Sequence, residues 1–244
     1  MSLIINTLFL ILAGTAAGLG GSVVGIASIF SYPALLLIGI NPIDANVTNS
    51  VSLTFLSIGS IIGSKPEWLP HTATLKKLAP ATFIGGVTGS ILLLKTPNSS
   101  FERIVPVLIA LASLAILIPR KDRPHSQKNV ALMAIVAVFI GIYSGYFGAA
   151  SGSMTMALLL QMLTINIATA HALKNVLMGI ANGIAALIFI ISGHVHWLPA
   201  IPLALGFFIG GRVGPSIVRK ANPNLIKGLV SSMGFGVAIW LAIK

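Results

Sequence analysis

Charged side chains are scarce in this sequence, and cysteine is absent altogether. Without cysteine there is no disulfide bond, no thiolate metal site and no cysteine nucleophile. Only 8% of the 244 residues are charged, whereas 56% are hydrophobic, and the mean hydropathy is +0.99. Such a chain cannot leave most of its segments in water without exposing large apolar surfaces. We therefore expect an all-α integral membrane protein that folds as one polytopic helical bundle.

Motifs of enzymes and ATP-driven pumps are also missing. The sequence has no GxxxxGK[ST] phosphate-binding loop, so transport energy would have to come from gradients or from a partner. It has no cysteine, no HExxH zinc motif and no expected buried acid to pair with a histidine, so an intramembrane enzyme is not expected. No cofactor and no bound metal are expected.

Long apolar runs make up most of the chain. We expect eight to ten membrane spans from the segments 3–20, 23–40, 45–63, 72–94, 101–118, 130–147, 153–165, 168–192, 198–218 and 225–243. Most approach the roughly 20 residues that cross a bilayer core of about 30 Å. Segment 153–165 would rise only about 20 Å as a helix, so it should be re-entrant or a half-helix. Its counterpart 23–40 is expected to be interrupted at Pro33.

The two halves of the chain share a pattern of glycine and polar residues. Glycines 14, 18, 21 and 25 recur 127 residues later, at 141, 145, 148 and 152. Positions 46, 49, 85, 86 and 89 match 171, 174, 210, 211 and 214 at an offset of 125. We interpret residues 1–119 as a first repeat, 120–128 as a basic cytoplasmic link and 129–244 as a second repeat.

Basic residues indicate the orientation. If the 120–128 link faces the cytoplasm, twelve of the fifteen basic residues lie at cytoplasmic ends, and only Lys95, Arg103 and Lys244 do not. The basic residues therefore act mainly as topology signals, and nucleic acid is not an expected partner. Each half has an odd number of segments, so the repeats are inverted, as in alternating-access carriers with a site near the midplane. Both termini would lie outside, in an inner (plasma) membrane.

The glycine-rich breaks are the expected substrate site. A broken apolar segment is tolerated in lipid only where protein shields it or where it lines a polar cavity. A helix start offers free N–H groups and a partial positive charge, which bind oxyanions. Glycines 14, 18, 141 and 145 instead have the spacing of helix packing. The candidate substrate-binding residues are Gly21, Ser22, Gly25, Ser28, Asn46, Asn49, Gly148, Ser151, Gly152, Ser153, His171, Lys174 and Asn175.

The sign of the charges favours an anionic substrate. The four carboxylates lie in or beside predicted loops, whereas cation pumps usually keep an acid within the membrane. Lys174 and Arg212 lie in or near the bilayer. Lys174 either contacts the anion or snorkels to the cytoplasmic headgroups, and Arg212 either contacts it or anchors its helix.

The histidines leave further alternatives. His171 could accept a proton that travels with the anion, or it could stand in water at a helix start. His194 and His196 have the spacing of metal ligands, but no third ligand is evident, and loop histidines beside the interfacial Trp197 are the commoner arrangement.

Five stretches resemble the sulfite exporter TauE/SafE family of membrane permeases: SxxSYPALL (28–36), ANVTNSVSL (45–53), GIYSGYFGAASG (141–152), HALKNVLMGIANGIAALIF (171–189) and GHVHW (193–197). The resemblance covers nearly the whole chain. It implies transport of small sulfur-containing anions such as sulfite, thiosulfate, sulfoacetate and related sulfonates. Two other functions stay open at this point, an anion channel and a structural subunit of a larger membrane complex.

Overall fold

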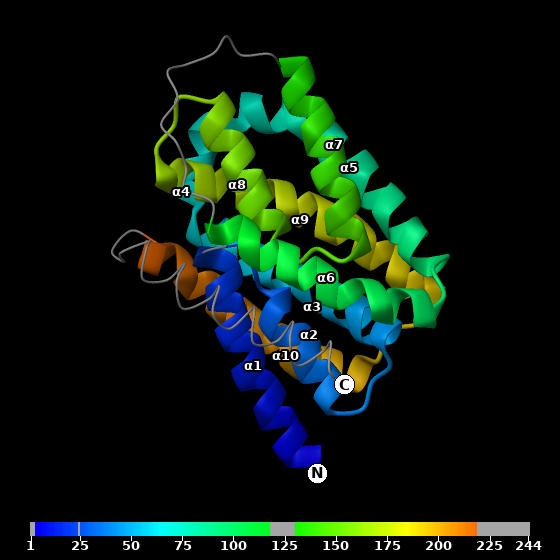
Figure 1. Ribbon diagram of the computed structural model, residues 1–244. Coiled ribbons are helices and arrows are strands. Elements are labelled where there is room, and N and C mark those ends of the chain that lie inside the picture. Colours follow the sequence, from blue (N-terminus) through cyan, green and yellow to red (C-terminus); the bar gives the residue numbers. More distant parts are fainter. Residues whose placement is uncertain (1–2, 24, 118–129, 219–244) are drawn as a thin grey trace.

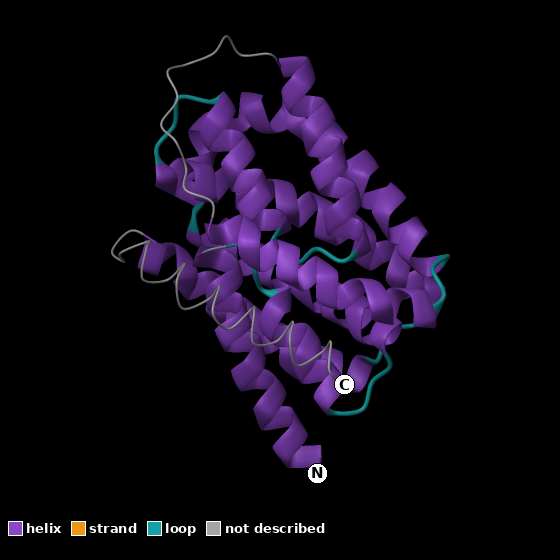
Figure 2. Ribbon diagram, in the orientation of Figure 1, coloured by secondary structure: helices purple, strands orange, loops and turns teal. Residues whose placement is uncertain are grey.

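The computed structural model describes residues 3–23, 25–117 and 130–218. These residues form helices and short connections and contain no strand (Figure 2). The elements are α1 (Leu3–Val23), α2 (Ser28–Leu37), α3 (Pro42–Gly63), α4 (Lys65–Trp68), the 3-10 turn η1 (Leu69–His71), α5 (Thr72–Leu94), α6 (Asn98–Leu117), α7 (Val130–Tyr146), α8 (Ser151–Met162), α9 (Ile167–Ser192) and α10 (Trp197–Val218). The all-α fold is therefore confirmed. The 120–128 link and segment 225–243 lie outside the described residues.

The surface of the bundle is apolar, and many polar side chains are inside. Leu12, Phe139 and Ile191 are 70%, 67% and 86% exposed, whereas Asn46 and Asn49 are fully buried. Within the described residues, five helical stretches are long and apolar enough to cross a membrane: Leu3–Val23, Pro42–Gly63, Lys65–Leu94, Ile167–Ser192 and Trp197–Ile217. A water-soluble monomer rarely exposes so much apolar surface. The bundle is a multi-pass membrane protein whose outward side chains face lipid.

Two helices are too short to cross a membrane. At 1.5 Å per residue, the ten residues of α2 and the twelve of α8 would span about 15 and 18 Å. The half-length expected for segment 153–165 is therefore present. The interruption expected at Pro33 lies elsewhere, because Pro33 is inside α2 and the chain turns at Gly25, with φ of +89°. Gly148 turns the chain before α8 with φ of +76°.

The long helices pack in corresponding pairs. Helix α1 lies along α10, and α7 lies along α5 (Figure 1). Helices α3 and α9 contact each other, and they also contact α10 and α5, respectively. Glycines make the close crossings possible. A Cβ added to Gly14 would lie 2.5 Å from the carbonyl oxygen of Leu203, and one added to Gly141 would lie 3.0 Å from the Cα of Gly85. These glycines therefore serve helix packing.

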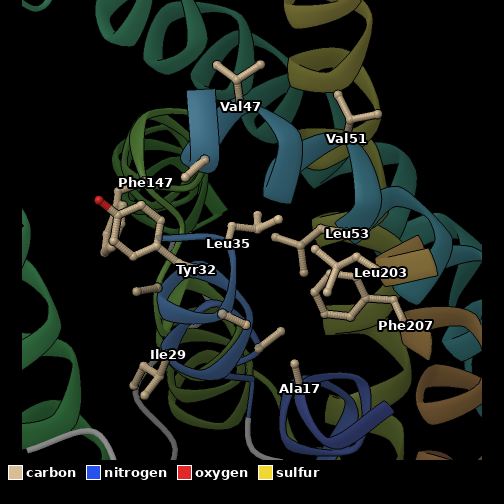
Figure 3. Packing of buried hydrophobic residues seen from close by; sticks show 14 of the residues in the cluster. Ala17, Ile29, Tyr32, Leu35, Val47, Val51, Leu53, Phe147, Leu203 and Phe207 are labelled. Atoms are coloured by element: carbon tan, nitrogen blue, oxygen red, sulfur yellow. The ribbon is translucent and has the colours of Figure 1, made fainter. Parts of the chain in front are cut away.

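An aromatic cluster holds the first short helix against the second break. The Tyr32 ring of α2 meets the Phe147 ring edge to face, with centroids 5.5 Å apart. Phe101 of α6 packs on the same two rings. Figure 3 shows Tyr32 beside Phe147 within the larger hydrophobic cluster. Edge-to-face pairs contribute about 0.5–1.5 kcal/mol beyond their buried area. The break before α8 is thus packed against α2.

Substitution of Gly14 by Ala should destabilise the bundle. Its Cβ would meet backbone atoms of α10, which cannot move aside, so we expect a loss of about 1–3 kcal/mol in the free energy of unfolding. The matched control is Gly183→Ala in α9, because nothing lies within 4 Å of that Cβ. Melting of detergent-purified protein, followed by tryptophan fluorescence, measures the difference. Equal melting temperatures for the two variants would contradict the crossing described here.

Candidate functional site

The two glycine breaks meet backbone to backbone. A Cβ added to Gly25 would lie 2.5 Å from the amide nitrogen of Ser153 and 2.9 Å from the Cα of Gly152. One added to Gly152 would lie 2.8 Å from the Cα of Gly25. Helices α2 and α8 each begin three residues after a turn, at Gly25 and Gly148, respectively. The starts of both short helices are therefore brought together at one point.

A cavity of about 40 Å³ lies at this meeting point. A single water needs roughly 10–15 Å³ measured in this way. Several of the predicted residues line the cavity, namely Gly21, Gly25, Ser28, Gly148, Ser151, Gly152, Lys174 and Asn175. No acidic residue is among the described residues around it. The lining therefore presents hydroxyls, an amide and one ammonium group.

Sequence reasoning missed one strip of lining residues on each of two helices. On α3 these are Leu53, Leu56, Ser57 and Ser60, on α9 they are Met178 and Asn182, and Ala27 also contributes. Residues four apart lie on the same face of a helix. Steps of four from position 49 reach 53 and 57, and steps of four from 174 reach 178 and 182. That spacing is the signal that could have identified most of them.

Lys174 caps the broken end of α1. Its side chain is only 2% exposed, and its Nζ donates hydrogen bonds to the carbonyl oxygens of Gly21, at 3.0 Å, and Ser22, at 3.2 Å. The last carbonyls of a helix lack partners and carry partial negative charge, so an ammonium group stabilises them. Snorkelling to the headgroups was the wrong alternative, because the amine points to the buried end of α1.

Asn46 caps the end of the other broken helix, α7. Its Nδ2 donates to the carbonyl oxygen of Tyr146, the last residue of α7, at 2.8 Å. Asn49 donates to the Ser28 hydroxyl at 3.1 Å. Neither asparagine lines the cavity. Both lie behind it, where they position the residues that do.

Three other predicted residues also lie away from the main cavity. Ser22 accepts a hydrogen bond from Ser60 at 3.2 Å. With His171, Asn175 and Glu67, it lines a smaller cavity of about 10 Å³. Ser153 is buried but is not a lining residue of either cavity. Because Asn175 borders both cavities, the smaller one lies next to the main one.

His171 and Arg212 differ from each other in burial. His171 is only 7% exposed, so the alternative of a histidine standing in water is wrong. Arg212 is exposed on α10 and lines neither cavity. Of its two alternatives, this position favours an anchor for the helix over contact with the anion.

His194 and His196 lie in the connection between α9 and α10, and both contact a residue that the sequence did not link to them. Asp44 of α3 lies 3.4 Å from His194 Nδ1 and 3.1 Å from His196 Nε2. Within the described parts of the chain, no group of three or more His, Cys, Asp or Glu side chains is arranged to hold a metal ion.

Apolar helices surround a cavity that lies at two helix breaks and has no acid among its described lining residues. This arrangement is typical of membrane transporters. Residues 10–241 match the family described as Sulfite exporter TauE/SafE. The match spans nearly the whole chain, so this protein belongs to that family. The resemblance drawn from the five sequence stretches is thereby confirmed.

Several named relatives support the transporter class. "Probable membrane transporter protein YfcA" of Escherichia coli K12 is 26% identical, over 93% of this chain and 86% of its own length. "Probable membrane transporter protein" of Haemophilus influenzae is 24% identical, over 91% and 89%. A third, "Probable membrane transporter protein ORF9" of Sinorhizobium sp, is 27% identical, over 96% and 91%. No solved structure matches this chain.

Gly25→Ala should damage the site more than Gly39→Ala does. Both glycines have positive φ, +89° and +93°, so both substitutions introduce backbone strain of about 1–3 kcal/mol. Only at Gly25 would the methyl group also meet backbone of the other break, because nothing lies within 4 Å of a Cβ at Gly39. Melting temperatures of the two variants separate strain from contact. A Gly25→Ala protein as stable as Gly39→Ala would show that the breaks do not touch.

Proposed function

We propose that this protein carries small anions, of the sulfur-containing oxyanion or organosulfonate type, across a membrane by alternating access. The observation that carries the proposal is the cavity between the two helix breaks, which is lined by Lys174 and by no described acid. A protein site of this kind favours negative charge, because both short helices begin at it. The family name supports sulfur-containing oxyanions as the substrate class.

The donors around the cavity suit an oxyanion. An ammonium group has three N–H donors, and two carbonyls account for two of those of Lys174. The third is available to a substrate, together with the hydroxyl of Ser57 and the amide of Asn182. Leu53 and Met178 form an apolar part of the lining. An oxyanion that carries a small organic group, as a sulfonate does, would place its charged end and its apolar end against matching surfaces.

The packing of the helices supports two inverted repeats, residues 1–119 and 129–244. Under the repeat, α1 corresponds to α7, α3 to α9 and α5 to α10. The contacts of α1 with α10 and of α7 with α5 are then equivalent. So are the contacts of α3 with α10 and of α9 with α5. Because each repeat contributes one break to the cavity, rocking one repeat against the other would expose the site to alternate faces.

Orientation and coupling complete the proposal. The distribution of basic residues places the 120–128 link in the cytoplasm and both termini outside, in an inner (plasma) membrane. Protons are the candidate coupling ion. His171 is the candidate acceptor, because the cavity that it lines adjoins the main one through Asn175.

Lys174→Ala should reduce anion uptake by about tenfold or more. Loss of a hydrogen bond from a charged donor costs about 1.5–3 kcal/mol, and each 1.4 kcal/mol is a factor of ten. Uptake of labelled sulfite, thiosulfate, a sulfonate and chloride into liposomes, with and without a pH gradient, is the measurement. Lys76→Ala is the matched control, because Lys76 is exposed and should transport normally. Unchanged uptake by Lys174→Ala would remove this lysine from the site.

Ser57→Ala tests the cavity without disturbing a helix end. Lys174 also caps α1, so its loss could reduce uptake through folding alone. Ser57 lies inside α3, and its hydroxyl lines the cavity, so its removal should raise KM severalfold while leaving the melting temperature within about 2 °C of wild type, as for changes of 0.5 kcal/mol or less. Saturable, sulfur-anion-selective uptake identifies a carrier, whereas an unsaturable chloride leak identifies a channel. If the pure protein moves none of these anions, the transport proposal fails for this chain alone, and a subunit role gains support.

A further inference from the structure

A charged cluster joins two helices that line the cavity. Asp44 lies in the first turn of α3, and His194 and His196 lie just after the end of α9. The Oδ1 of Asp44 is 3.4 Å from His194 Nδ1, and its Oδ2 is 3.1 Å from His196 Nε2. The carboxylate is 19% exposed, and the imidazoles are 53% and 48% exposed. Water therefore reaches the histidines, which can exchange protons with it.

Further hydrogen bonds fix the two sides of this cluster. Asn41 begins α3 by accepting from the amide of Asp44 at 3.0 Å, and its Nδ2 donates to Asp44 Oδ2 at 2.6 Å. On the other side, the backbone amide of His196 donates to the Thr48 hydroxyl at 3.1 Å. The connection between α9 and α10 is thus tied to the first two turns of α3. Figure 1 shows the start of α3 and the end of α9 at the same end of the bundle.

The opposite end of the same helix pair cannot form this cluster. Asn166 begins α9 as Asn41 begins α3, by accepting from the amide three residues later, that of Thr169, at 2.8 Å. Thr169 therefore occupies the position equivalent to Asp44. At the offset of 125, the positions of His194 and His196 correspond to Leu69 and His71. A threonine has no charge to offer a histidine, so the equivalent positions differ between the two ends. At the opposite end the acid and the histidine are Glu67 and His171, which line the smaller cavity.

We propose that Asp44, His194 and His196 form a proton-strengthened latch that closes this end of the cavity. Helices α3 and α9 contribute Ser57 and Asn182 to the lining, so separating their ends at the latch opens the cavity to that face. Histidine changes its charge between about pH 5 and 8. A protonated imidazole attracts the Asp44 carboxylate, so protonation tightens the latch. A neutral imidazole retains only a hydrogen bond to the carboxylate, so the latch is weaker without the proton.

Other charged residues lie at this end of the bundle, but they are not part of the latch. Lys95 follows α5, and Glu102 and Arg103 lie in the first turns of α6. In the described part of the chain, the ion pairs recorded for Asp44 are those with His194 and His196. Glu102 is exposed, and no recorded ion pair joins it to either histidine. Glu102→Gln is therefore the matched control, because it removes one negative charge from the same end of the bundle without removing a latch contact.

The natural absence of cysteine allows a direct test of access. Ser57→Cys places a single thiol in the cavity, and a membrane-impermeant thiol reagent is applied to one face at a time in vesicles, at pH 6 and pH 8. Ser99→Cys, at an exposed position, supplies the reference for reagent reactivity at each pH. Variants are compared in the same Ser57→Cys background at the same pH, because a buried thiol and an exposed thiol differ in thiolate fraction. Asp44→Asn should raise the normalised labelling rate from the latch face by roughly two- to fivefold at pH 6, as for two exposed ion pairs. The increase should be smaller at pH 8. Combined His194→Gln and His196→Gln substitutions should remove the pH dependence of the Asp44→Asn effect, and Glu102→Gln should leave the rate unchanged.

The results separate the latch from the transport proposal on which it rests. Equal labelling of Asp44→Asn and Glu102→Gln at both pH values would overturn the latch, as would labelling of neither variant from any face. If Asp44→Asn opens the cavity but the protein carries no anion, the latch stands and the proposed function fails. If the increase is found from the face that carries the 120–128 link, the latch stands and the proposed orientation is wrong.

Discussion

The hydrogen bonds of two broken helix ends in a low-dielectric interior are the constraint on which the structure depends. An unpaired backbone group costs several kcal/mol in hydrocarbon. Helices α1 and α7 nevertheless end inside the bundle, where Gly25 and Gly152 bring the following segments into contact. Lys174 satisfies the end of α1, and Asn46 satisfies the end of α7. Each donor comes from the other half of the chain, so neither break can be closed without both halves.

The two breaks also separate helix-end carbonyl groups, which carry partial negative charge, from helix-start amide groups, which carry partial positive charge. The carbonyl ends of α1 and α7 are covered by donors, whereas the starts of α2 and α8 border the cavity. What remains open is the positive end of each short helix. A cavity built in this way needs no arginine to favour anions, and Arg212 accordingly lies exposed on α10, away from it. The polarity of the site follows from how the breaks are closed.

Much of this architecture could be predicted from local features of the sequence. Hydropathy located the helices, and the repeated glycines located both breaks, because lipid and close backbone contact leave few alternatives to apolar runs and glycine. The capping role of Asn46 and the contact of Asp44 with two histidines 150 residues away in the sequence could not be predicted. Those pairings depend on which helices lie next to α3, namely α7 for Asn46 and the end of α9 for Asp44, and no local pattern encodes this. The interruption predicted at Pro33 was wrong for a different reason. Proline lacks a backbone N–H, but α2 accommodates it, and the chain turns instead at Gly25, which has positive φ.

If the two halves exchange arrangements, as the proposed alternating access requires, a repeated bundle with a central site has no inherent direction of transport. Direction has to come from residues that differ between equivalent positions. Asp44 and Thr169 are such a pair, and both follow an asparagine that caps its helix in the same way. Asn46 and His171 are another, as are Asn49 and Lys174. Under the proposed alternating access, differences in contacts at equivalent positions would bias opening toward one face. Asp44, which caps no broken helix, would then influence the direction of transport more than the fold, whereas Lys174 is needed for the fold as well.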